Sequence, residues 1–90
     1  MASKHIVVNG RVQGVNFRSA AEDAAQDIGV AGWVRNRDDG SVELVVEGDD
    51  DAVDRMVGWA RQGPSAAEVT DVDVTDTEPQ GLTSFEQRES

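Results

Sequence analysis

The sequence contains no cysteine, one histidine, one lysine and no tyrosine, and each shortage narrows what the protein can do. Without cysteine there is no disulfide, no thiolate nucleophile and no cysteine-based zinc site. The lone His5 cannot supply a site made of several histidines, so we expect no bound metal and no cofactor. There is also no apolar run long enough to span a bilayer, and no signal-peptide pattern opens the chain. We therefore expect a cytoplasmic protein without membrane contacts.

Positive charge is scarce as well. The sequence has eight Lys and Arg and 18 Asp and Glu, which gives a formal net charge of −10 and a sequence pI near 4.2. A nucleic-acid binder needs a basic patch, so this balance argues against one. Two interpretations of the acidity remain open: a well-solvated surface that keeps the protein monomeric by self-repulsion, or adaptation to high salt, where screening removes that repulsion.

The 90 residues suffice for one domain with one modest core, and we assign 1–90 to a single domain. Apolar residues from Phe17 to Ile28 recur at helical spacing, and so do those from Val53 to Ala60. The remaining periodic segments are β-rich and predict strands at 4–10, 31–37, 41–47, 67–77 and 83–87.

The turn residues between these segments support the assignment. Asp38-Asp39-Gly40 separates the second and third strands, and an Asp-Gly pair there predicts a hairpin. In the third strand Val42, Leu44 and Val46 alternate with mostly polar residues, which predicts one apolar face. Asp49 is placed to cap the second helix, and Pro64 to stop it.

The resulting order, β-α-β-β-α-β followed by a short edge strand, indicates an α+β fold. It is the split β-α-β plan of ferredoxin-like sandwiches, in which an antiparallel sheet carries both helices on one face.

The segment from Gly10 to Arg18 joins the first strand to the first helix. Backbone N–H groups at a helix start lack intrahelical partners, and the helix dipole there favours an anion. Glycines let such a loop curl so that successive N–H groups converge. Arg18 falls in the first helical turn, and its planar guanidinium suits phosphate oxygens. Taken alone, these residues fit a phosphate cradle and a plain strand-to-helix turn about equally well.

Asn36 is the second unusual residue, because asparagine is a poor strand former and stands here at the end of a predicted strand. It could simply terminate the strand. Alternatively, its amide could hold a water molecule by donating one hydrogen bond and accepting another.

Together the two segments resemble the two signatures of the acylphosphatase family. The matching residues are Gly10-x-Val12-Gln13-Gly14-Val15-x-Phe17-Arg18 and Gly32-Trp33-Val34-Arg35-Asn36-x-x-x-Gly40-x-Val42, with Gly48 beyond. The resemblance implies hydrolysis of the carboxyl–phosphate bond of small acyl phosphates. It further implies that Arg18 binds the phosphate with the loop N–H groups of Gln13, Gly14, Val15, Asn16, Phe17 and Arg18, and that Asn36 positions the attacking water.

Two other functions share part of this pattern. An RNA-binding module shares this element order but stacks bases on sheet aromatics, and this chain has only two Trp and two Phe and no basic face. An acylphosphatase-like module could instead act on carbamoyl phosphate within a larger maturation system. The end of the chain at residue 90, without a partner domain, favours a free-standing enzyme.

Several conspicuous residues are expected to be structural. We predict packing roles for His5, Trp33 and Trp59, turn roles for Asp38 and Asp39, and a solvated helix start for the acidic run at 49–51. Because an anionic substrate must approach an acidic protein, we also predict a small positive mouth formed by arginines of the two segments, namely Arg11, Arg18, Arg35 and Arg37.

Overall fold

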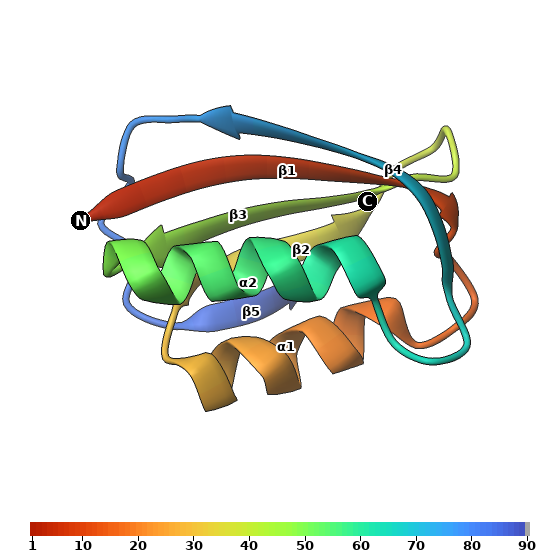
Figure 1. Cartoon of the computed structure of the whole chain (residues 1–90), viewed down its shortest axis with the longest axis horizontal. Coiled ribbons are helices and arrows are strands. Elements are labelled where there is room, and N and C mark those ends of the chain that lie inside the picture. Colours follow the sequence, from red (N-terminus) through yellow and green to blue (C-terminus); the bar gives the residue numbers. More distant parts are fainter. Residues whose placement is uncertain (90) are drawn as a thin grey trace.

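A computed structural model describes residues 1–89 and contains the seven predicted elements in the predicted order (Figure 1). The strands are β1 (Ala2–Arg11), β2 (Ala31–Asn36), β3 (Val42–Gly48), β4 (Glu68–Asp76) and β5 (Phe85–Arg88), and the helices are α1 (Phe17–Ile28) and α2 (Asp50–Gln62).

The five strands form one sheet in the order β4-β1-β3-β2-β5. The first four pair antiparallel, as predicted, whereas β5 runs parallel to β2 at the sheet edge. This topology brings the end of β1, the end of β2 and the end of β5 to the same end of the molecule, on the right in Figure 1. The predicted ferredoxin-like sandwich is confirmed.

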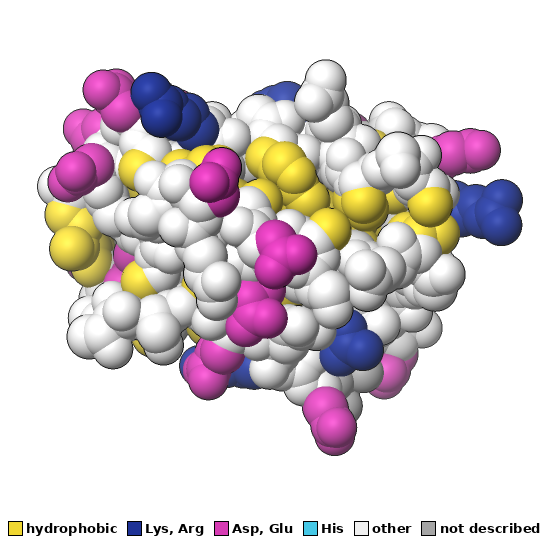
Figure 2. Space-filling view, turned by 90° about the horizontal axis from the view of Figure 1, so that it is seen from below, with side chains coloured by type: hydrophobic (Ala, Val, Ile, Leu, Met, Phe, Trp, Pro, Cys, Tyr) yellow, Lys and Arg dark blue, Asp and Glu magenta, His cyan; other side chains and the backbone are white. Residues whose placement is uncertain are grey.

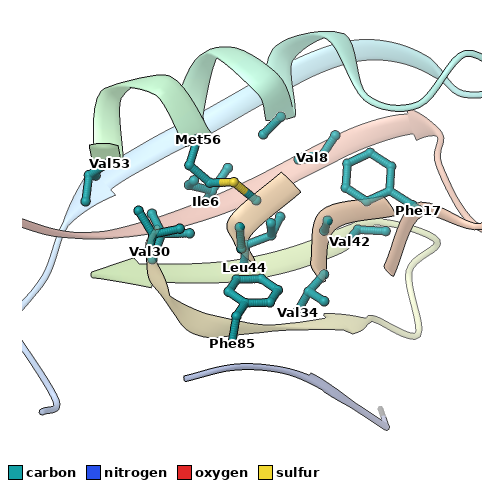
Figure 3. Close-up of a cluster of buried hydrophobic side chains, with 14 of the residues drawn as sticks. Ile6, Val8, Phe17, Val30, Val34, Val42, Leu44, Val53, Met56 and Phe85 are labelled. Atoms are coloured by element: carbon teal, nitrogen blue, oxygen red, sulfur yellow. The ribbon is translucent and has the colours of Figure 1, made fainter. Parts of the chain in front are cut away.

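Both helices cover one face of the sheet, and the core lies between these two layers (Figure 3). The helical stripes end up inside because residues three and four apart share a helix face. Strand residues at alternate positions meet them from the sheet. The fully buried side chains include Ile6, Val8, Val12, Val34, Val42, Leu44, Val46, Val53 and Met56. Phe85 of β5 also points into this core, as predicted.

Both helices of residues 1–89 lie on one face of the sheet, yet the central carboxylates of the opposite face are buried. Glu43 and Glu47 of β3 are only 9% and 2% exposed. The alternation in β3 predicted a polar face, and the structure adds that this face is covered at its centre. Glu43 is flanked by His5 and Arg35 from the neighbouring strands, because β3 lies in the middle of the sheet.

The surface is otherwise strongly acidic. Figure 2 shows Asp and Glu side chains spread over the face that it displays, with a few Lys or Arg between them. Across residues 1–89, no helix is both long and apolar enough to cross a membrane.

Candidate active site

The loop between β1 and α1 is anchored in the core at both of its ends. Val12 is fully buried, and Phe17, the first residue of α1, is 2% exposed. The Phe17 ring packs edge-on against Trp59 of α2, with 5.2 Å between the ring centroids and 64° between the planes. These contacts confirm the packing role predicted for Trp59 and hold the residues between Val12 and Phe17 against the sandwich.

Two residues of this loop adopt left-handed backbone conformations. Gly14 has φ +74°, and Asn16 has φ +63° and is the one positive-φ residue other than glycine in the described chain. Asparagine tolerates this region better than most residues, because its short polar side chain can hydrogen-bond the nearby backbone. The two reversals curl the loop so that the chain enters α1 at Asn16, its N-cap residue.

The start of α1 lacks the groups that normally neutralise it. The Asn16 side chain makes no capping hydrogen bond, and the first turn contains no acidic residue. It carries Arg18 instead, a cation at the positive end of the helix dipole. In contrast, α2 has Asp50 and Asp51 in its first turn. An anion bound at the start of α1 would satisfy both the free N–H groups and the arginine.

The start of α2 has the N-cap residue and the acidic first turn that the sequence predicts. Asp49 occupies the N-cap position as expected, but its side chain makes no capping hydrogen bond. Its backbone carbonyl accepts from the Val53 N–H at 2.9 Å, which is the ordinary first bond of the helix. Asp49 therefore acts here through its charge near the helix dipole rather than as a hydrogen-bonded cap.

Arg18 and Asn36 line one pocket, although they lie on different elements and far apart in sequence. The pocket has a volume of about 150 Å³. Asn36 is the last residue of β2 and lines the pocket opposite the first residues of α1. The pocket is lined by Val12, Gly14, Asn16, Phe17, Arg18, Ser19, Asn36 and Gln87.

The C-terminal strand also contributes to this site. The Arg18 guanidinium donates from Nη1 to the backbone carbonyl of Arg88 at 3.2 Å. Gln87 lines the pocket and donates from Nε2 to Ser19 Oγ at 3.4 Å and to Glu22 Oε1 at 3.1 Å. The sequence gives no signal for Gln87, a polar residue in a polar tail until β5 pairs with β2, or for Ser19, one of several polar residues of α1.

Gln13 and Val15, both predicted to bind substrate through their backbone N–H groups, are not among the residues that line the pocket. The Val15 side chain packs against the core. The Gln13 side chain turns toward the β2–β3 hairpin, where Nε2 donates to the carbonyls of Arg37 and Ser41 at 2.7 and 2.9 Å. Their backbone contacts with phosphate stay predictions.

The hairpin borders a second, more open pocket of about 330 Å³, lined by residues 35–39. Asp39 is committed to the turn, since its carboxylate accepts from the Ser41 N–H at 2.9 Å and from Ser41 Oγ at 2.5 Å. These hydrogen bonds, first the hydroxyl and then the backbone, lower the pKa of Asp39 below its usual range. Asp39 therefore has the turn role predicted for it.

His5 and Trp33 lie outside the Arg18 pocket. His5 Nε2 lies 2.5 Å from Glu43 Oε2, while Arg35 Nε donates to Glu43 Oε1 at 2.5 Å. Burial raises the pKa of Glu43, but the hydrogen bonds from His5 and Arg35 outweigh it and the net pKa is lowered. Trp33 is 9% exposed and lies beneath the guanidinium groups of Arg35 and Arg88, at 5.7 and 4.9 Å from its ring centroid. Both residues are packed as predicted.

Arg35 thus donates its hydrogen bond to Glu43. Of the four arginines predicted to form a positive mouth, only Arg18 lines this pocket. In residues 1–89, no group of three or more His, Asp or Glu side chains is arranged to hold a metal ion.

Comparisons with known proteins show the family of this chain. The acylphosphatase family model matches residues 4–87. An acylphosphatase from Roseiflexus is 53% identical over 81 residues, which are 90% of this chain and 87% of the relative. One from Haloarcula marismortui is 51% identical over 84 residues, covering 93% of this chain and 92% of the relative.

Solved structures give the same result. The crystal structure of acylphosphatase from Bacillus subtilis superposes with a TM-score of 0.94 at 39% identity, covering 98% of this chain and 99% of that one. The structure of T. kodakarensis HypF matches at a TM-score of 0.86 and 29% identity, but the match covers only 12% of that chain. On these matches and on the pocket that joins its two signature segments, the chain belongs to the acylphosphatase family.

Proposed function

We propose that this acylphosphatase cleaves the carboxyl–phosphate bond of small acyl phosphates in the Arg18 pocket. Arg18 and the N–H groups of the 13–18 loop bind the phosphoryl oxygens, and Asn36 holds the attacking water. The observation that carries the proposal is the convergence of Arg18 and Asn36 on one pocket at a helix start that has neither a side-chain cap nor an acidic first turn.

The substrate's own chemistry explains why so few groups suffice. The water oxygen bonds to phosphorus while the bond from phosphorus to the acyl oxygen breaks. The leaving group is a carboxylate, whose conjugate acid has a pKa of about 4, so no general acid is needed. The water proton passes to a phosphoryl oxygen. What remains for the protein is positioning and stabilisation of the charge on the equatorial oxygens.

Kinetic measurements can separate the roles of the Arg18 and Asn36 side chains. Arg18→Ala removes a phosphate ligand, so we expect kcat/KM to fall about 10²–10³-fold and inhibition by inorganic phosphate to weaken. Asn36→Ala removes the water ligand, so we expect kcat to fall with phosphate affinity largely kept. Arg55→Ala, which removes a charge from the exposed face of α2, is the matched control. Wild-type turnover in both site variants would contradict the assignment.

We further propose a cytoplasmic monomer that is adapted to concentrated salt. The net charge of −10 on 90 residues supports this, as does the acidic surface in Figure 2. Concentrated salt shortens the screening length to about 3 Å at 1 M, which both relieves self-repulsion and lets an anionic substrate approach. Sedimentation at low and molar KCl tests the monomer.

A further inference from the structure

The Gln13 side chain joins the two parts of the site, which are the loop between β1 and α1 and the hairpin next to Asn36. We propose that Gln13 is a positioning residue, which sets the distance between the phosphate-binding loop and Asn36 by holding the loop to the β2–β3 hairpin. The proposal rests on the roles proposed above for Arg18 and Asn36, and it assigns to the Gln13 side chain a task separate from its backbone N–H.

On the hairpin side, the Gln13 amide bonds to both arms of the turn, at residues just beyond the ends of β2 and β3. Its Nε2 donates to the Arg37 carbonyl at 2.7 Å and to the Ser41 carbonyl at 2.9 Å. Arg37 follows Asn36 directly, and Asn36 pairs with Val42, the neighbour of Ser41. The Arg37 N–H also donates to the Ser41 carbonyl at 2.9 Å. Gln13 is therefore attached one residue beyond the strand pair that carries Asn36.

On the loop side, Gln13 stands between the fully buried Val12 and the pocket residue Gly14. Its backbone therefore moves with the phosphate-binding loop, while its side chain is held by the hairpin. A hydrogen bond anchored on two carbonyls leaves the amide little freedom, since both of its N–H donors are used. Gln13 thus fixes the distance between the loop and Asn36, and the substrate and the water must align between these two.

Loss of this connection should disturb alignment more than binding. In Gln13→Met the side chain keeps its length but donates no hydrogen bond. Because a displacement of about 1 Å can cost about 10²-fold in rate, we expect kcat to fall by about 10–100-fold. We expect the inhibition constant of inorganic phosphate to change by less than about 3-fold, since Arg18 and the start of α1 are untouched.

Gln62→Met, the same change at the exposed end of α2, is the control and should leave both constants unchanged. Gln13→Lys retains a donor in reach of the two carbonyls and should recover most of the lost kcat. This variant also keeps the proposal testable if Gln13→Met unfolds, and thermal unfolding of each variant is measured alongside its activity.

The decisive measurement is a double-mutant cycle with Asn36. If Gln13 acts through Asn36, the Gln13→Met change should cost less than about 2-fold in kcat once Asn36 is Ala. The proposal is overturned if kcat of Gln13→Met equals wild type, if its cost is undiminished beside Asn36→Ala, or if phosphate affinity falls in parallel with kcat. The Asn36→Ala variant by itself tests the proposed function, so the two failures are distinguishable.

Discussion

Replacing Glu47 by glutamine should show how much its buried carboxylate stabilises the fold by binding the segment that leads into β5. Glu47 is 2% exposed and lies under the segment that leads into β5. Its carboxylate accepts from the backbone N–H groups of Gln80 and Leu82, the latter at 3.0 Å, and from Ser3 Oγ at 3.3 Å. One buried carboxylate thus holds two backbone donors of a segment with no strand or helix of its own.

The size of the effect follows from these bonds. Glutamine keeps one acceptor oxygen and replaces the other with an N–H₂ group, which faces a backbone donor. A buried hydrogen bond to a charged group contributes about 1.5–3 kcal/mol. We therefore expect Glu47→Gln to lower the free energy of unfolding by about 2 kcal/mol at pH 7, or the melting temperature by roughly 8–16 °C for a domain of this size. Urea unfolding at pH 7 measures the first quantity.

The effect should also depend on pH. Burial raises the pKa of Glu47, but the N–H donors of Gln80 and Leu82 outweigh it, so the folded-state pKa lies below the ordinary value of 4.5. A carboxyl group with a lowered pKa stabilises the fold above its unfolded pKa and loses that stabilisation as the pH falls through the folded one. The difference between wild type and Glu47→Gln should therefore be full at pH 7 and shrink below about pH 4.5.

Glu78→Gln is the control, because Glu78 is exposed in the same segment. A loss under about 0.5 kcal/mol in Glu47→Gln, within the range of an ordinary surface change, or a loss that persists unchanged at pH 3, would refute the reasoning.

Two further predictions concern the backbone and the surface. Gly32 has φ +149°, and a Cβ there would collide with the Val45 carbonyl, so Gly32→Ala should lower the free energy of unfolding by about 3 kcal/mol or more. Gly58 lies inside α2 with open space at its Cβ position, so Gly58→Ala should instead raise the free energy of unfolding by about 0.5–1 kcal/mol. Urea unfolding of the pair checks both signs, and equal effects would contradict the steric argument. Raising KCl from 0.1 to 1 M shortens the Debye length from about 10 to about 3 Å, so the melting temperature should rise; a protein most stable without salt would disprove high-salt adaptation.

The amino-acid sequence by itself determined the elements and their order, and it singled out the segment from Gly10 to Arg18 as a candidate anion site. Each depends on local information: apolar spacing marks the helices, Asp39-Gly40 marks the hairpin, and a glycine-rich turn before Arg18 fits an anion site or a plain strand-to-helix turn. Asn36 was conspicuous because asparagine fits poorly at its strand position. The resemblance to a known family then joined two segments that local reasoning could not bring together.

Only the tertiary structure decided which groups hydrogen-bond to the side chains of the candidate site. The contacts of Gln13 with the hairpin and of Arg18 with the Arg88 carbonyl join segments far apart in the chain, and no local pattern encodes them. The same holds for Glu43 and Glu47, whose alternation with valines predicted a polar face. Their burial follows from the place of β3 at the centre of the sheet and from the segment that leads into β5, which long-range strand pairing alone establishes.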